Sequence, residues 1–195
     1  LNNLIKNSLF FDAIVSNVSN ILELIKRKKY NSIILNYDET ADNFLKWYQQ
    51  LVAESLGKKG KGIFPSISTM PKDNHSLMQL YLDGSQNNFF TFFFTQENSS
   101  KIIRSGFLHT SQKFLINKNL KDISLSKMQA TQRVFSKKKI PYRSFLINNR
   151  SEEALGELFC FFIIETILLG KALNVNPYDQ PAVELIKNET KKILI

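Results

Sequence analysis

The sequence predicts a single α/β domain in which a parallel sheet is covered by helices on both faces. Short apolar segments rich in β-branched or aromatic residues, such as Asn31–Tyr37 and Asn88–Thr95, alternate along the chain with helical patterns. The chain has 195 residues, 43% of them hydrophobic, which is enough to bury one full core. No internal repeat or low-complexity linker divides it. We therefore expect a doubly wound α/β domain.

The chain opens with an amphipathic helical pattern over Leu1–Lys29, where apolar residues recur at steps of three and four. We expect this helix to form a leading segment, residues 1–30, and the domain proper to occupy residues 31–195. The run Asn31–Tyr37 then predicts the first buried strand, because it is short, apolar and β-branched.

The segment Asp38–Gly57 predicts the next helix. Asp38 or Thr40 is its expected N-cap, because short polar side chains accept hydrogen bonds from the first free backbone N–H groups. Gly57 stands where the helix should end, and it begins the glycine- and lysine-rich turn Gly57–Gly62.

The rest of the chain continues the alternation of strands and helices. We expect, in order, a strand at Gly62–Ser68, a helix at Asp73–Gly84, a strand at Asn88–Thr95, a helix at Leu125–Lys139, a strand at Tyr142–Asn149, a long helix after Ser151 and a last helix from Pro181. The region between residues 98 and 124 is less regular, and its pattern suggests only a helix within Phe107–Ile116. Ser151 is the expected N-cap of the long helix, because two glutamates follow it at the positive helix end.

The net charge of +9 raises the question of a nucleic-acid partner. Lysine and arginine cluster at Lys26–Lys29, Gly57–Gly62 and Lys137–Lys139. These clusters are scattered, however, and no strand combines aromatic with basic residues. We therefore expect no nucleic acid, and the charge fits phosphorylated small molecules at least as well. A steep loss of DNA affinity with salt would revive the other interpretation.

The most apolar run is Ala154–Gly170, which Glu157 and Glu165 interrupt. A membrane span needs about 20 predominantly apolar residues, so we expect a buried helix and no membrane partner. Cys160, the single cysteine, lies in this run and can form no internal disulfide. The sequence starts with no cationic segment followed by an apolar core, so we expect no signal peptide. A reducing, cytoplasmic location follows.

Polar groups that could carry chemistry fall at three places, which we expect beyond the carboxyl ends of the strands, where α/β sheets bind ligands. Gln50 and Glu54 are four residues apart, so they share a helix face beside a glycine-rich turn. His75 lies in the first turn of a helix capped by Asp73 or Asn74. The positive helix end there favours a neutral imidazole that can accept a proton.

The third place is the segment NPYDQPAVELIK, residues 176–187. Asp179 is its expected N-cap, and the second proline fits the first helical turn. Gln180, Glu184 and Lys187 follow at helical spacing and share one face. Taken alone, each of these side chains is most often a solvated surface group, and we expect Glu184 to hold the helix in place rather than to act in chemistry.

Several common kinds of site have no motif in this sequence. There is no cluster with metal-ligand spacing, no G-x-S-x-G, no P-loop and no G-x-G-x-x-G. We therefore expect no metal and none of the common hydrolase, nucleotide or dinucleotide functions, and the chemistry that the resemblance described next implies requires no cofactor.

Three separated segments carry a family resemblance. WYQQLVAESLGKKGKGIFP, residues 47–65, resembles the segment around the catalytic glutamate of the glucose-6-phosphate isomerase (phosphoglucose isomerase) family. DNHSLMQLYLDG, residues 73–84, resembles that family's catalytic histidine segment. GKALNVNPYDQPAVELIK, residues 170–187, resembles its C-terminal signature. The three occur in the family's order, and the likeness extends more loosely from about Val18 to the C-terminus.

The resemblance implies a role for each of five residues. It assigns Glu54 as the base that moves a proton between C1 and C2 of the sugar. It assigns His75 to opening and closing the sugar ring, with Lys187 in the same part of the site. Gln50 and Gln180 match positions that contact the substrate. The fold implied is a sugar isomerase domain with a five-stranded parallel sheet, in a homodimer whose histidine reaches the neighbouring subunit's site.

Two of the family's motifs do not occur in this sequence. One is a Ser/Thr-rich loop that binds phosphate, and the other is an arginine that follows a glycine pair and steadies the enediolate. Both belong to the family's first domain, which would precede this sequence. We therefore expect the chain to be the second, C-terminal domain of a two-domain enzyme and to be inactive on its own.

The leading interpretation is thus half of an aldose–ketose isomerase of glycolysis and gluconeogenesis. It would interconvert glucose 6-phosphate and fructose 6-phosphate through a cis-enediol. The alternative is a non-catalytic sugar-phosphate-binding domain with a regulatory role. Glu54 argues against the alternative, because such a domain has no need of a carboxylate at the base position.

Overall fold

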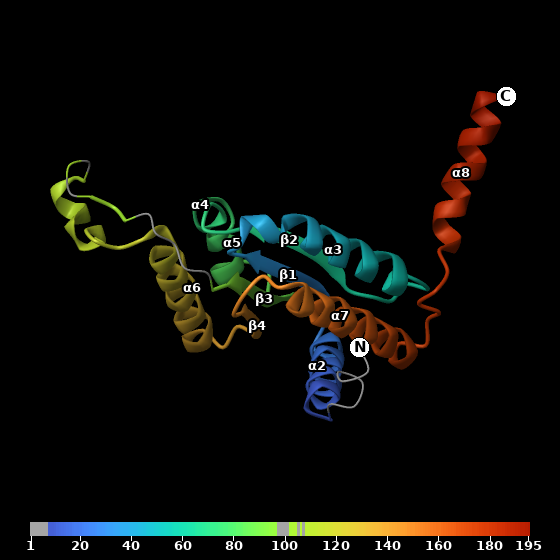
Figure 1. Ribbon diagram of the computed structural model, residues 1–195. Helices are drawn as coiled ribbons and strands as arrows, with labels where there is room; N and C mark the ends of the chain where they lie inside the picture. The colour runs from blue at the N-terminus through green and yellow to red at the C-terminus, as the bar shows by residue number, and fades with distance from the viewer. Residues whose placement is uncertain (1–7, 97–101, 105, 107) are drawn as a thin grey trace.

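A computed structural model of the chain describes residues 8–96, 102–104, 106 and 108–195 (Figure 1). Its elements are, in order, α2 (Ser8–Lys26), β1 (Asn31–Asn36), η1 (Glu39–Ala41), α3 (Asp42–Leu56), β2 (Phe64–Thr69), α4 (Asp73–Ser76), α5 (Met78–Asp83), β3 (Asn88–Thr95), η3 (Thr110–Leu115), α6 (Leu120–Lys137), β4 (Tyr142–Ile147), α7 (Glu152–Ala172) and α8 (Pro181–Leu194). η1 and η3 are 3₁₀ helices.

The four strands form one parallel sheet with the order β2-β1-β3-β4. Ile34 of β1 lies opposite Ile67 of β2 on one side and Thr91 of β3 on the other. The strand order reverses direction at β1, because the chain first moves from β1 to β2 and then crosses back to β3. The expected doubly wound parallel sheet is confirmed.

The five strands implied by the family resemblance are not found, since the described residues form four. The sequence pattern predicts four strand segments, and no fifth segment with a strand pattern was identified. The region between β3 and α6 contains the 3₁₀ helix η3 and an isolated bridge between Ile102 and Asn119.

Helices cover both faces of the sheet, as predicted, and each face has its own core. On one face, α2, α3 and α7 pack against Ile34, Phe89 and Phe93. The other face presents Leu35 and Phe92 to α5 and α6. Successive strand residues point to opposite faces, so one apolar strand supplies both cores.

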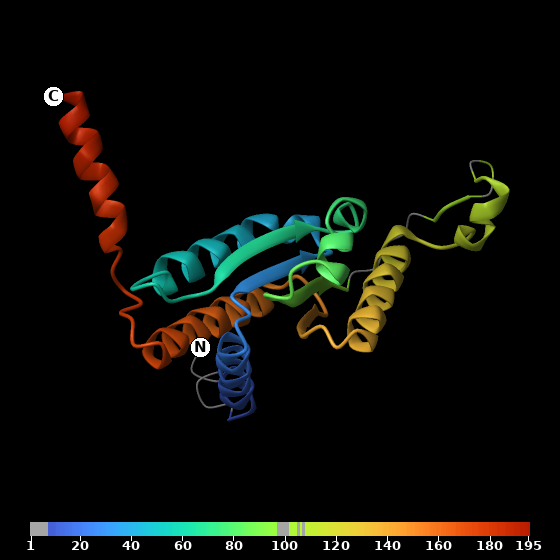
Figure 2. The ribbon, with the colours of Figure 1, turned by 180° about the vertical axis from the view of Figure 1, so that it is seen from behind.

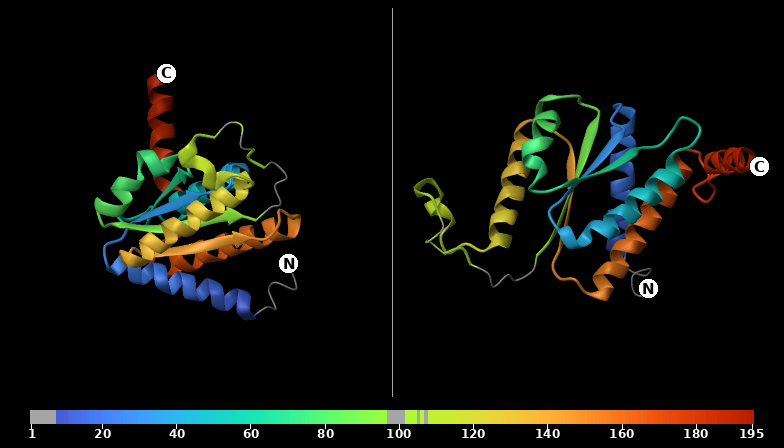
Figure 3. Two further views of the ribbon diagram at one scale, coloured as in Figure 1. Left: turned by 90° about the vertical axis from the view of Figure 1, so that its left-hand side faces the viewer. Right: turned by 90° about the horizontal axis from the view of Figure 1, so that it is seen from above.

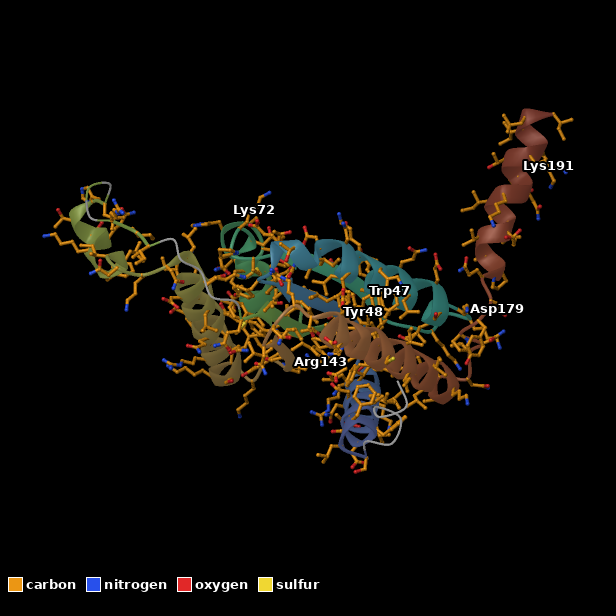
Figure 4. The ribbon with its side chains drawn as sticks, viewed as in Figure 1. Trp47, Tyr48, Lys72, Arg143, Asp179 and Lys191 are labelled. Carbon is orange, nitrogen blue, oxygen red and sulfur yellow. The ribbon has the colours of Figure 1, made fainter. Side chains whose placement is uncertain are left out.

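A buried ion pair and the hydrogen bonds around it link strands and helices on the first of these faces. The Arg143 guanidinium from β4 pairs with the Glu165 carboxylate from α7, with one of the two N–O distances at 3.2 Å. The same guanidinium donates to the Tyr48 hydroxyl of α3 at 3.1 Å and to Thr91 at 3.0 Å. Figure 4 shows Tyr48 and Arg143 in the middle of the molecule. Burial raises the pKa of the Tyr48 hydroxyl, although the charge of Arg143 opposes the rise.

Several element boundaries differ from those expected. The helix expected at Asp73–Gly84 divides into α4 and α5 at Leu77, where φ is −121°. α6 begins five residues earlier than the predicted Leu125, because the Asn119 side chain caps it by accepting from the backbone N–H of Asp122 at 2.7 Å. The first seven residues of the expected leading helix lie outside the described residues.

The expected caps were right at some helix ends and wrong at others. Ser151 caps α7 by accepting from the Ala154 N–H at 3.1 Å, as predicted. Asp38 caps the short helix η1 rather than α3 itself. Asp179 does not cap α8, whose N-cap is Gln180, while Pro181 occupies the first helical position as expected.

Among the described helices, α2 is long and apolar enough to cross a membrane by length and composition. This indication is weak, because core helices of soluble proteins pass the same test. Ile14, Val18 and Ile21 of α2 are buried in the core beside α7.

The last helix, α8, stands apart from the rest of the fold. It projects away from the sheet and its covering helices in opposite views (Figures 1 and 2). None of its residues is buried. Seen from above in Figure 3, α8 and the segment carrying η3 lie at opposite ends of the molecule.

Candidate active site

The candidate site lies at the amino edge of the sheet. The crossover helix α3 and the last core helix α7 both run back from the carboxyl ends of the strands, so both end at this edge. The turn Gly57–Gly62 follows α3, and the loop 173–180 follows α7. Figure 1 shows these two connections and the base of α8 gathered on the same side of the molecule.

Glu54 is the centre of this site, and both of its carboxylate oxygens accept hydrogen bonds from amides. Gln50 donates from Nε2 to Oε1 at 2.9 Å, one helical turn earlier on α3. Gln180 donates from Nε2 to Oε2 at 2.6 Å from the start of α8. Gln50 and Glu54 thus share a helix face as predicted, and the fold adds Gln180 to them.

A hollow of about 440 Å³ opens beside this carboxylate. Glu54 and Lys58 line one side of it, and Asn176, Gln180 and Val183 line the other. Glu54 itself is half-buried. A half-buried carboxylate that is held by two amides can accept a proton from a bound molecule, and the amides can hydrogen-bond to hydroxyl groups of the same molecule.

The turn after α3 depends on two glycines. A Cβ on Gly57 would stand 2.7 Å from the carbonyl oxygen of Ala53. Gly62 has a φ of +114°, and a Cβ there would stand 2.7 Å from the carbonyl oxygen of Leu56. Both positions therefore favour glycine, and the turn they form brings the chain from Glu54 directly into β2.

His75 lies at the opposite, carboxyl edge of the sheet, on the short helix α4 after β2. It is exposed. The N-cap of this helix is Lys72, without a side-chain cap bond, rather than the expected Asp73 or Asn74. A pocket shared by Glu54 and His75 within one copy of this chain is therefore excluded by the length of β2, whose six residues span about 20 Å.

Asp73 fixes the segment that carries His75. Its carboxylate accepts hydrogen bonds from the Ser68 hydroxyl, the Thr69 backbone N–H and the Ser76 hydroxyl, each at 2.8 Å. Desolvation alone would raise the pKa of Asp73, but the hydrogen bonds from Ser68, Ser76 and Thr69 outweigh it and lower the pKa.

The expectation that all candidate groups lie beyond the carboxyl ends of the strands is wrong for Glu54 and Gln180. Glu54 stands near the end of a crossover helix, and such a helix returns the chain to the amino edge before the next parallel strand begins. Figure 4 marks the two edges, with Lys72 beside the helix of His75 and Asp179 at the base of α8.

Lys187 is not brought to Glu54 in this chain. Its ammonium group pairs with the Glu184 carboxylate one turn earlier on α8, at 2.6 Å, and both side chains are exposed. The expectation that Glu184 holds the helix in place is therefore wrong for the described structure. The two residues stabilise only their own helix, because an exposed pair of this spacing is worth only a few tenths of a kcal/mol.

Lys58 also belongs to this site and was not predicted from the sequence. Its side chain is 10% exposed and pairs with the Asp179 carboxylate at 3.0 Å. The sequence contained a signal for it, because Lys58 continues the four-residue spacing of Gln50 and Glu54. This lysine was interpreted only as part of the basic cluster in the turn Gly57–Gly62. In the part of the chain that the structure describes, no group of three or more His, Cys, Asp or Glu could hold a metal ion.

Fold and site together define an α/β protein in which the Glu54 carboxylate lies at the amino edge of a parallel sheet, between two glutamine amides. The sequence profile of one family, described as phosphoglucose isomerase, matches residues 13–195. The chain belongs to the phosphoglucose isomerase family.

Curated relatives support this membership. The chain is 34% identical over 169 residues to a protein named glucose-6-phosphate isomerase from Methanocaldococcus jannaschii, a match that covers 86% of this chain and 40% of the relative. It is 36% identical, also over 169 residues, to one of the same name from Mycoplasmopsis synoviae, covering 84% and 39%. The chain thus spans about two fifths of the length of these relatives.

Solved structures share the fold. A hypothetical protein, TT0462 from Thermus thermophilus, superimposes with a TM-score of 0.87 at 24% identity, over 99% of this chain and 48% of that one. A glucose-6-phosphate isomerase from Chlamydia trachomatis superimposes with a TM-score of 0.64 at 19% identity, over 85% and 34%. At these identities the likeness shows the fold alone.

Proposed function

We propose that this chain is the catalytic, C-terminal sugar isomerase domain of an enzyme that interconverts glucose 6-phosphate and fructose 6-phosphate. Family membership and the names of the relatives support the activity. The single observation that carries the assignment of the site is the Glu54 carboxylate held between Gln50 and Gln180 beside a hollow. We place this enzyme in the cytoplasm, in glycolysis and gluconeogenesis.

In this proposal Glu54 is the base of the isomerisation. Aldose–ketose isomerisation removes a proton from the carbon next to a carbonyl and returns it to the neighbouring carbon, through a cis-enediol. One carboxylate on one side of the sugar can make both transfers, which is why a single Glu54 is sufficient. Gln50 and Gln180 would hold sugar hydroxyls on either side of it. A positioned base of this kind is worth about 10²–10⁴-fold in rate.

His75 and Lys187 take the separate task of opening and closing the sugar ring, which needs proton transfer at the ring oxygen and at O1. Their distance from Glu54 within one chain supports a homodimer. In that dimer, His75 of one copy would reach the hollow of the other. The charge of +9 suits a phosphorylated substrate, and the proposal includes no nucleic acid, membrane, metal or cofactor.

The proposed dimer can be tested by mixing two inactive variants of the parent protein that contains this chain. Glu54→Gln copies lack the proposed catalytic carboxylate, and His75→Ala copies lack the proposed ring-opening imidazole. In a mixed dimer with exchanged histidines, one site has lost both groups and the other has kept both. Random mixing should then restore about one quarter of the wild-type activity, because half of the dimers are mixed and each has one intact site. If each copy used its own His75, mixing would restore nothing.

A coupled assay from fructose 6-phosphate to glucose 6-phosphate tests the activity itself. We expect turnover by the parent protein and none, or nearly none, by the 195-residue chain alone, because the family's phosphate loop does not occur in this sequence. Turnover of the isolated chain at an enzymatic rate would contradict the second expectation. A parent protein that binds sugar phosphates without turning them over would be a regulatory binding module instead.

A further inference from the structure

The loop before α8 has to be fixed by something other than α8. None of the residues of α8 is buried, and its two ion pairs among the described residues, Lys187–Glu184 and Lys192–Glu189, both lie within the helix. Gln180 nevertheless lies 2.6 Å from Glu54. It is the N-cap residue of α8, but its side chain makes no cap bond, and its amide nitrogen donates to Glu54. The position of Gln180 is therefore set by the loop that precedes it.

Lys58 holds that loop at two points. Its ammonium group donates to the backbone carbonyl of Asn176 and pairs with the Asp179 carboxylate at 3.0 Å. Within the loop, the Asn176 amide donates to the other Asp179 oxygen at 2.9 Å, and the Tyr178 backbone N–H donates to the Asn176 side chain at 3.1 Å. The loop thus closes on itself around the lysine.

The attachment is stronger than that of an ordinary surface lysine. The Lys58 side chain is 10% exposed, whereas Lys187 in its pair on α8 is 64% exposed. Little water competes for the Lys58 ammonium group, so its bonds to the loop are screened less. The hydrogen bond from Lys58 lowers the pKa of Asp179. Nearby, Lys61 donates to the carbonyl oxygen of Leu173 at 2.9 Å, where the loop begins.

We propose that Lys58 is a positioning residue of the active site, which presents Gln180 to the catalytic carboxylate of Glu54 by holding the loop 173–180. Two neighbouring contacts therefore join the end of α3 and its following turn to the loop before α8. Glu54 contacts Gln180, and Lys58, four residues after Glu54, contacts Asp179. This inference rests on the proposed function for its kinetic consequence, but its structural consequence can be measured in the isolated chain.

The structural test is amide hydrogen exchange of the 195-residue chain, followed by NMR. In Lys58→Met, which removes the charge and keeps the length, we expect the Tyr178 amide to exchange at least about tenfold faster than in the wild type. The Gln180 side-chain amide should also shift toward the position of a solvated amide. Lys58→Arg should retain most of the protection, because it keeps the charge and the donors. Unchanged exchange in Lys58→Met would overturn the proposal.

Two further variants make the structural result specific. Asp179→Asn removes the ionic partner from a half-exposed position outside the core, so we expect the core to stay folded and the Tyr178 amide to be freed in the same way. Lys46→Met is the matched control. Lys46 is exposed, lies two turns before Glu54 on the same side of α3, and makes no ion pair with a described residue. Faster exchange of Tyr178 in this control would show a general effect of charge and would contradict the proposal.

The kinetic test uses the parent protein. Lys58→Met should lower kcat by about 10- to 100-fold, the loss expected when a contact next to the reacting groups is misplaced, with a smaller change in KM. Lys58→Arg should recover much of this loss, which a change of overall stability would not do. If the loop is released but kcat is unchanged, Lys58 does not position the site. If the wild-type parent has no activity, the proposed function fails while the exchange result still decides the role of Lys58.

Discussion

Gln180 donates a hydrogen bond to Glu54 at 2.6 Å across 126 positions of sequence. Glu54 lies in the last turn of α3, which runs back from the end of β1. Gln180 follows α7, which runs back from the end of β4. Both helices run against the direction of the strands, so both deliver their ends to the amino edge of the sheet. The contact between these two residues is thus a consequence of the parallel topology.

Replacing Gln180 with glutamate tests the electrostatics of this contact. A second carboxylate within hydrogen-bond distance would repel the Glu54 carboxylate and disfavour its ionised form. The acid limb of the pH profile of kcat/KM in the parent protein should therefore move upward by about one pH unit or more. Gln132→Glu on α6, where the amide bonds to Ser144, is the control and should leave that limb in place. An unshifted limb in Gln180→Glu would show that the two side chains do not meet in the working enzyme.

Asp73→Asn should destabilise the chain in a pH-dependent way. The pKa of Asp73 is lowered in the folded state, so its contribution to stability is present above its unfolded pKa and is lost as pH falls through the lower folded pKa. At pH 7 we expect the variant to lose about 1 kcal/mol of unfolding free energy in urea. As pH falls through this lowered folded pKa, the stabilities of the wild type and the variant should converge. A difference that persisted at pH 2 would contradict this account.

Because the Arg143–Glu165 ion pair is buried, we expect the free energy of unfolding to depend strongly on both partners. Glu165→Leu leaves the Arg143 guanidinium buried without its counter-charge, and we expect a loss of roughly 3–5 kcal/mol in urea unfolding. Replacing both Arg143 and Glu165 with leucine should lose clearly less than Glu165→Leu alone, because no unpaired charge remains. Glu184→Gln is the exposed counterpart on α8 and should change stability by less than about 1 kcal/mol. Equal losses from the buried and exposed pairs would contradict this assignment.

The last helix should add little to the stability of the isolated chain. Deleting residues 182–195 removes no buried side chain. We therefore expect the melting temperature to change by less than about 2 °C, since 1 kcal/mol shifts it by about 2–4 °C in a chain of this size. A decrease of more than about 5 °C would mean that α8 packs against the core in solution.

Much of the fold could be predicted from the sequence, because buried strands and amphipathic helices leave strong patterns. The aromatic run Asn88–Thr95 was found with its full bounds, since its residues fill both cores at once. The start of α6 was missed because its first turn, from Leu120, is exposed and its cap, Asn119, lies in an irregular region. The fifth strand came from the family resemblance alone, and no pattern in the chain supported it.

The candidate site was predicted only in part. The spacing of Gln50 and Glu54 gave their shared face correctly, because a helix fixes the relation between residues four apart. The contact with Gln180 depends on two long connections and could not follow from spacing. The rule that α/β sheets bind ligands beyond the carboxyl ends of their strands predicted the wrong edge for Glu54. That rule describes the loops that follow strands, whereas Glu54 lies near the far end of a crossover helix. The role of Lys58 could not follow from the sequence, since its partners lie more than a hundred residues away along the chain and only the fold brings them together.

The most direct test of the account is the Glu54→Gln variant of the parent protein in the coupled assay from fructose 6-phosphate to glucose 6-phosphate. Glu157→Gln, an exposed position on α7, is the matched control. We predict that Glu54→Gln lowers kcat by at least about 10²-fold while the protein still binds the sugar phosphate, because glutamine keeps the shape and loses the base. The control should keep its activity. If Glu54→Gln turned over substrate as the wild type does, Glu54 would not be the base, and the central claim would fail.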